Sequence, residues 1–87
     1  MKFRPAKSYI KLTTGDAVRI ARELQEMTQV ELARASGLSQ PTISGIEKNR
    51  VTLGADRARA LAKALRVHPG VLLFPDWKPE EAGLKAG

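Results

Sequence analysis

The fold of this chain is decided by twenty residues, TQVELARASGLSQPTISGIE, which occupy positions 28–47. At the start of this stretch, Thr28 and Glu31 have the spacing of a capping box, in which each side chain bonds to the backbone N–H of the other residue. A helix is therefore predicted to begin after Thr28. Gly37 ends this helix, because glycine adopts the left-handed conformation of a helix C-terminus without a Cβ clash.

A second short helix follows almost at once. Ser39 is a good N-cap, and Pro41 stands in the first turn, where the N–H that proline lacks would have no helical partner. We predict this helix from Gln40 to about Lys48. Two short helices joined by a glycine-containing turn form a helix-turn-helix.

Helical patterns also fill the chain on either side of this motif. Before it, one of the threonines at 13–14 can cap a helix whose good helix formers continue through Met27. After it, aliphatic residues and alanines recur at helical spacing over residues 53–65, and His68 can cap a last short helix that Pro69 opens. The sequence therefore predicts an all-α bundle of five helices. We divide the chain into a basic N-terminal arm (1–13), the helix-turn-helix domain (14–74) and a C-terminal tail (75–87).

The composition is typical of a soluble globular protein, with 43% hydrophobic and 28% charged residues. A length of 87 residues allows one small domain. Since the chain has no cysteine and one histidine, we expect no disulfide, no metal site and no cofactor. His68 has no nucleophile that can be assigned to it, so an enzyme is not expected either.

The chain has no apolar run near the roughly 20 residues that span a bilayer. Residues 1–12 also lack the apolar core of a secretory signal. We therefore expect a cytoplasmic protein that does not contact a membrane.

Positive charge is in excess: 15 lysines and arginines face 9 acidic residues, which gives a net charge of +6. Four of the basic residues and none of the acidic ones lie in the arm at 1–13. This excess favours a polyanionic partner, although a need for solubility alone would also explain it.

The stretch 28–47 resembles the helix-turn-helix of the phage Cro and repressor-like family, also called the xenobiotic-response-element class. The family pattern is T-Q-x-x-L-A, a turn G-[LIV]-S, and Q-x-x-[IV]-S-x-[IL]-E, and this sequence matches every anchor. The resemblance covers about residues 14–74. It implies a five-helix Cro/repressor-like bundle that binds double-stranded operator DNA as a homodimer.

The resemblance also implies which residues read DNA bases. The helix predicted at 40–48 corresponds to the recognition helix, whose N-terminal residues face base edges in the major groove. The candidates are Gln40, Pro41, Thr42 and Ser44. Gln40 is the best of them, because a glutamine amide matches the donor and acceptor pair of adenine. Pro41 and Gly45 depart from phage repressors that carry amides there, so part of the specificity could come from DNA shape.

A second group of candidates would hold the phosphate backbone. These candidates are Gln29, Ser39, Lys48, Asn49 and Arg50. Gln29 could instead simply tolerate the first turn of its helix, and a polar turn such as 48–50 is common in any protein.

Other residues of the motif have structural roles in this interpretation. The resemblance implies a partly buried ion pair between Arg22 and Glu47. The aliphatic residues and the small alanine between the two helices are expected to form core contacts. These are Leu32, Ala33, Leu38, Ile43 and Ile46.

The end of the domain is predicted to hold the dimer interface. Leu72, Phe74 and Trp77 are too many large apolar groups for so short a helix to bury within one domain, and Leu72 is expected to lie nearest the monomer core. Ile20, Leu24 and Met27 form a second apolar row on the first predicted helix. We expect the N-terminal arm or a partner protein to pack against this row.

Three alternatives stay open for the arm. It could follow a DNA groove, form a short strand at residues 9–12 that pairs with another chain, or be a disordered basic tail.

The resulting hypothesis is a dimeric transcriptional repressor. By analogy with small members of the family, it could be an autoregulating antitoxin that also binds a small toxin protein. The alternative is a protein-interaction module, toxin-neutralising or adaptor, that keeps the fold but has weak DNA readout.

Overall fold

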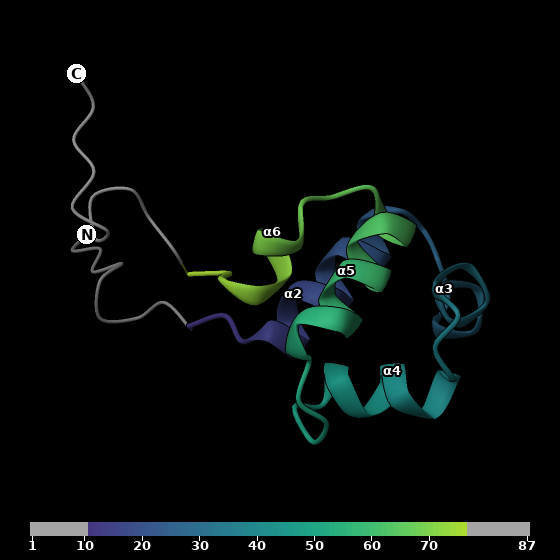
Figure 1. The fold of residues 1–87 in the computed structure, drawn as a ribbon, viewed down its shortest axis with the longest axis horizontal. Helices are drawn as coiled ribbons and strands as arrows, with labels where there is room; N and C mark the ends of the chain where they lie inside the picture. Colours follow the sequence, from purple (N-terminus) through teal and green to yellow (C-terminus); the bar gives the residue numbers. More distant parts are fainter. Residues whose placement is uncertain (1–10, 77–87) are drawn as a thin grey trace, which may run out of the picture.

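Five helices follow one another in the computed structural model, which describes residues 11–76 (Figure 1). They are α2 (Thr14–Leu24), α3 (Gln29–Ser36), α4 (Gln40–Glu47), α5 (Gly54–Leu65) and α6 (Pro69–Leu73). Within these residues there is no strand, so the all-α prediction is confirmed. Lys11 to Thr13 are not in a strand. Tyr9, Ile10 and Trp77 lie outside the described residues, so the expected strand at 9–12 and the interface role of Trp77 stay predictions. The division into arm, domain and tail stays a prediction.

The helices pack around one core. α5 contacts α2, α3 and α6, while α4 packs against α2 and α3. α4 runs along one edge of the bundle and α6 lies at the opposite edge (Figure 1). The side chains that are fully buried come from every helix: Val18, Leu32, Ile43, Ile46, Leu61, Leu65 and Leu72. The expected core residues Leu32, Ile43 and Ile46 are thus confirmed, and Ala33 and Leu38 are half-buried against them.

Local hydrogen bonds define where the helices begin and end. Thr28 and Glu31 form the predicted capping box, and Ser39 Oγ accepts from the N–H of Thr42. Gly37 adopts the left-handed conformation, with φ of 81°. His68 caps α6 through Nδ1, which accepts from the N–H of Gly70. All of these bonds join residues close in sequence, which is why the sequence predicts them.

The first helix is shorter than predicted. α2 ends at Leu24 instead of continuing through Met27, because Glu26 adopts a left-handed φ of 57°. Arg22 holds the turn that follows α2, because its Nη1 donates to the carbonyl of Met27 at 2.7 Å. The half-buried Met27 packs against the core. It therefore does not extend an exposed row with Ile20 and Leu24.

The start of α2 lies directly against the end of α4. A Cβ at Gly15 would lie 2.7 Å from the carbonyl oxygen of Glu47 and would also collide with that of Ile46. Only a glycine lets the two helix ends approach so closely.

No helix in the described part of the chain is both long and apolar enough to cross a membrane.

Candidate nucleic-acid interface

α4 turns one side to the core and the other away from the protein. Ile43, Ile46 and Glu47 are buried. At 100° per residue, the opposite side carries Pro41, Ser44, Gly45 and Lys48, and Gln40 borders it beside Glu47. We call these five residues the outer face of α4.

Three of the four predicted base-reading residues therefore share this face. Pro41 is exposed, and Gln40 and Ser44 are half-buried. Thr42 lies at the other edge of the helix, and its Oγ1 accepts a hydrogen bond from Ser39 Oγ at 2.7 Å. Its hydroxyl is thus engaged in the cap of α4.

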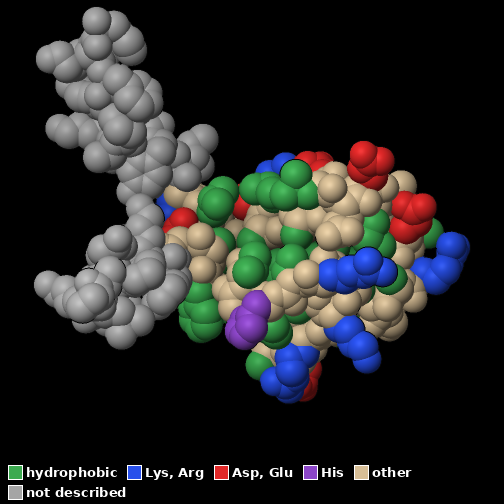
Figure 2. Space-filling model, turned by 90° about the horizontal axis from the view of Figure 1, so that it is seen from above, with side chains coloured by type: hydrophobic (Ala, Val, Ile, Leu, Met, Phe, Trp, Pro, Cys, Tyr) green, Lys and Arg blue, Asp and Glu red, His purple; other side chains and the backbone are tan. Residues whose placement is uncertain are grey.

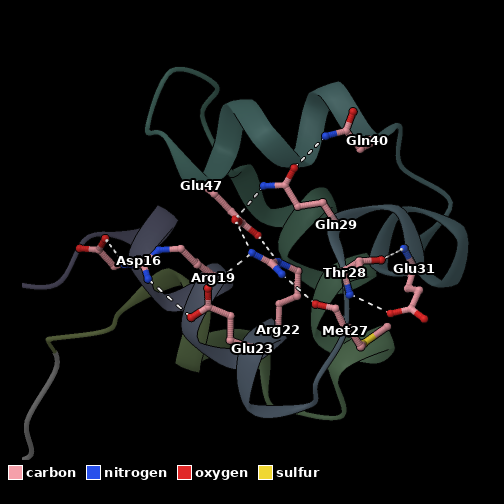
Figure 3. A network of polar contacts seen from close by, with 10 residues as sticks. All are labelled: Asp16, Arg19, Arg22, Glu23, Met27, Thr28, Gln29, Glu31, Gln40 and Glu47. Atoms are coloured by element: carbon pink, nitrogen blue, oxygen red, sulfur yellow. Dashed lines mark hydrogen bonds and ion pairs between the residues drawn. The ribbon is translucent and has the colours of Figure 1, made fainter.

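A network of hydrogen-bonded polar side chains connects Gln40 of the outer face with the neighbouring helices (Figure 3). The expected ion pair is present, with Arg22 Nε donating to Glu47 Oε2 at 2.7 Å and Arg22 Nη2 to Glu47 Oε1 at 3.0 Å. Gln29 Nε2 also donates to Glu47 Oε1, at 3.0 Å. Gln40 Nε2 in turn donates to Gln29 Oε1 at 2.7 Å. The network therefore runs from α2 through α4 and α3 back to the first residue of α4.

The ion pair at the base of this network is largely buried. The side chains of Arg22 and Glu47 are only 12% and 4% exposed. The hydrogen bond to Glu47 raises the pKa of Arg22, although burial opposes this shift. A buried charge needs such partners, because an unpaired one would cost several kcal/mol.

The network also orients Gln40. Its amide nitrogen points toward Gln29, and its carbonyl oxygen points away from Gln29 (Figure 3). Because an amide has two N–H groups and one carbonyl, Gln40 keeps one donor and one acceptor for another partner.

The predicted phosphate-binding residues lie at both ends of α4 and at the start of α3. Ser39 is exposed and caps α4, while Lys48, Asn49 and Arg50 are exposed in the turn that follows α4. Gln29, the first residue of α3, is half-buried and uses both ends of its amide within the network. Within the protein, Gln29 is a positioning residue for Gln40.

Asn49 has a structural task that the sequence did not indicate. Its Oδ1 accepts from the N–H of Gly15 at 3.2 Å, and its Nδ2 donates to Thr13 Oγ1 at 3.0 Å. Asn49 adopts a left-handed φ of 60°, which asparagine tolerates better than most residues. It fastens the end of α4 to the start of α2, so its phosphate role stays a prediction.

Sequence reasoning also missed Arg57 in the first turn of α5. Its Nη1 donates to the carbonyl of Thr52 at 3.0 Å and so bridges the loop between α4 and α5. A basic residue there opposes the helix dipole, and this mismatch was the available signal.

At the opposite edge of the bundle, the residues predicted to form the dimer interface differ in exposure. Leu72 is fully buried in the monomer core, which agrees with its expected place nearest the core. Because it offers no surface to a second subunit, its assignment to the dimer interface is corrected. Phe74 is 63% exposed. Trp77 lies outside the described residues.

Phe74 belongs to a larger apolar area, which we call the α2–α6 surface. It comprises Leu12, Ile20, Leu24, Val71 and Phe74, which are all exposed. A shallow hollow of about 260 Å³ lies between α2 and α6, lined mainly by apolar side chains. Figure 2 shows hydrophobic side chains gathered beside the histidine, while lysines and arginines are spread over the rest of this face.

Comparison with known proteins agrees with this geometry. A model of the family described as helix-turn-helix matches residues 18–72. An uncharacterized HTH-type transcriptional regulator, y4aM of Sinorhizobium fredii, is 28% identical over 86 residues, which are 99% of this chain and 59% of that protein. The chain thus spans about three fifths of the length of this relative.

Solved structures resemble the fold closely. The P22 c2 repressor in complex with a synthetic operator matches with a TM-score of 0.70 and 29% identity, over 76% of this chain and 100% of that one. The restriction-modification controller protein C.AhdI of Aeromonas hydrophila matches with a TM-score of 0.66 and 28% identity, over 69% of this chain and 91% of that one.

Proposed function

The chain belongs to the helix-turn-helix family, and we propose that it is a transcriptional repressor that binds operator DNA sequence-specifically as a homodimer. The observation that carries the proposal is the network Arg22–Glu47–Gln29–Gln40, which holds Gln40 on the outer face of α4 with a free donor and a free acceptor. The similarity to the operator-bound P22 c2 repressor supports the same function.

In this proposal α4 enters the major groove. Gln40 pairs with the N6 and N7 edge of an adenine, and the ring of Pro41 packs on a thymine methyl group. Ser44 contacts a base edge or a phosphate. Thr42, at the other edge of the helix, lies beside the DNA backbone. Because Gln40 is held before DNA arrives, less side-chain freedom is lost on binding.

The DNA backbone would be held from both sides of α4. Lys48 and Arg50 supply positive charge at its C-terminal end, while Ser39 and the start of α3 at Gln29 face the backbone at the other end. Asn49 would act mainly by fixing the position of this turn. The net charge of +6 attracts the duplex before specific contacts form.

Homodimer formation would use the α2–α6 surface. A single domain presents one recognition helix, whereas the operators of such repressors have two half-sites about one helical turn apart. α6 lies opposite α4, so a contact through Phe74 leaves α4 free (Figure 1). Exposed apolar groups of this size favour burial against a second copy.

The first test measures what Gln40 does. A preferred duplex is selected from a random pool, and its binding is compared with that of a random duplex for the wild type and Gln40→Ala. We expect the variant to bind the preferred duplex about 5- to 150-fold more weakly and the random duplex almost unchanged, because one bidentate base contact is worth roughly 1–3 kcal/mol. Equal losses on both duplexes would show that Gln40 does not read bases.

A second candidate function is a protein-interaction module, such as an antitoxin that neutralises a small toxin protein. The α2–α6 surface favours it, as does the lack of donor side chains at Pro41 and Gly45. The two functions coexist in an autoregulating antitoxin. Failure to enrich any duplex from the random pool would reject the repressor and leave the interaction module.

A further inference from the structure

The outer face of α4 has a gap in its side chains at Gly45, and a residue from outside the helix fills it. A Cβ placed on Gly45 would lie only 2.6 Å from Cγ2 of Val51 and 3.4 Å from its Cβ. The Val51 methyl group therefore occupies the space where any side chain of residue 45 would begin.

The backbone holds Val51 in this place. The carbonyl oxygen of Gly45 accepts from the N–H of Arg50 at 2.8 Å and from that of Val51 at 3.2 Å. Val51 is half-buried and packs against the core on its other side. Its position beside α4 is thus set by two hydrogen bonds and by core packing, and it does not depend on DNA.

Helical spacing places this methyl group among the proposed DNA contacts. Residue 45 lies four positions after Pro41 and three before Lys48, so the three share one strip of the helix surface. A loop residue thus adds an apolar group to a strip that already carries the exposed ring of Pro41. In the major groove, the apolar feature of a base pair is the C5-methyl group of thymine.

We propose that Val51 is a specificity-determining residue, whose side chain contacts a thymine methyl group of the operator. This inference rests on the proposed function and deepens it. Gly45 is needed because a larger residue would push Val51 and its loop away from α4. The recognition surface is therefore composite, with polar contacts from the helix and an apolar contact from the loop after it.

Deoxyuridine tests the proposal, because it differs from thymidine only by lacking the methyl group. Each thymine of the selected duplex is replaced singly by deoxyuridine, and binding is measured for the wild type, Val51→Ala and Val51→Thr. We expect the wild type to lose about fourfold in affinity at the thymine that Val51 contacts in each half-site, the effect of removing one apolar carbon from a contact. A separate loss is expected at the thymine under Pro41, and the Val51 variants should keep it. Val51→Ala should lose the sensitivity at the Val51 thymine alone, and Val51→Thr, which has the same shape, should reduce it.

The control is Val30→Ala, which shortens an exposed valine on α3. It should show the wild-type pattern of deoxyuridine effects. Helicity and the midpoint of thermal unfolding verify that each variant is folded, and Val51→Thr keeps the test valid if Val51→Ala unfolds. Identical deoxyuridine patterns for the wild type and both folded Val51 variants would overturn this inference while leaving the repressor function intact. A wild type that prefers no duplex would overturn the proposed function itself.

Discussion

At the scale of single residues, polar side chains in this protein act mostly by holding other groups in place. Arg22 and Glu47 form a buried ion pair, and Glu47 also accepts from Gln29, which orients Gln40. No buried side-chain nitrogen or oxygen in the described part of the chain lacks a hydrogen-bond partner. A satisfied network of this kind favours one conformation of the site over others.

Asp16 is a residue whose charge should affect stability. Its carboxylate accepts from the N–H of Thr13 at 3.0 Å, which is the main reason why its pKa is lowered; Arg19 adds a smaller effect. Because the folded pKa lies below the unfolded one, the charged carboxylate stabilises the fold above about pH 4. This contribution is lost as the pH falls through the folded pKa.

We therefore expect Asp16→Asn to flatten the decline in stability as the pH falls below about 4. Urea unfolding at a series of pH values measures this decline. The matched control is Asp56→Asn, which removes a carboxylate from the first turn of α5, where the side chain is 94% exposed. Parallel stability curves for Asp16→Asn and the wild type would contradict the prediction.

At the scale of elements, α4 depends on its neighbours for its orientation. An isolated helix of eight residues is not stable in water. Gln29 holds the start of α4 through Gln40, and Asn49 ties its end to Gly15 of α2. The helix is thus supported at both ends, which suits its proposed entry into a DNA groove without bending.

The turn after α4 carries the next prediction. Lys48→Ala and Arg50→Ala should each weaken binding to every DNA sequence and lower the salt dependence of binding by about one counterion per monomer. Fluorescence anisotropy over a series of salt concentrations measures the slope. Lys63→Ala, which removes an exposed lysine near the end of α5, is the matched control and should keep the wild-type slope. An unchanged slope for both turn variants would place Lys48 and Arg50 away from the phosphates.

At the scale of the whole molecule, two different surfaces lie at opposite edges of the bundle. The outer face of α4 is mainly polar and is followed by basic residues, whereas the α2–α6 surface is apolar. α5 lies between them and contacts both α3 and α6. In the proposed function, this separation would let the protein bind DNA on one side and a second copy on the other.

Loss of Phe74 should weaken that second contact. Phe74→Ala, alone and together with Trp77→Ala, is expected to raise the dimer dissociation constant at least tenfold, because each subunit would lose large apolar area from the proposed interface. Sedimentation equilibrium measures mass, and circular dichroism verifies that the helices remain. Val30→Ala, which shortens an exposed valine on α3, is the control and should remain dimeric. A double variant with wild-type mass and DNA affinity would reject Phe74 and Trp77 as interface residues and direct attention to Tyr9, Ile10 and Leu12 of the arm.

The sequence by itself determined the helices and most of their limits. Thr28, Ser39 and His68 cap helices as predicted, because a cap bonds to an N–H only two or three residues away. The periodicity of aliphatic residues likewise predicted the buried side of α4. The prediction that the first helix continues through Met27 was wrong. The turn there depends on the bond from Arg22 to the carbonyl of Met27, and Glu47 of α4 holds Arg22 in place for that bond.

Only the tertiary structure decided how these elements serve the site. The bond between Gln40 and Gln29 joins residues 11 apart in sequence, and the bond between Asn49 and Gly15 joins residues 34 apart. The contact of Val51 with Gly45 likewise depends on where the loop after α4 returns to the helix. Residue spacing along one helix carries no information about such contacts, because they result from the packing of all the side chains between the helices.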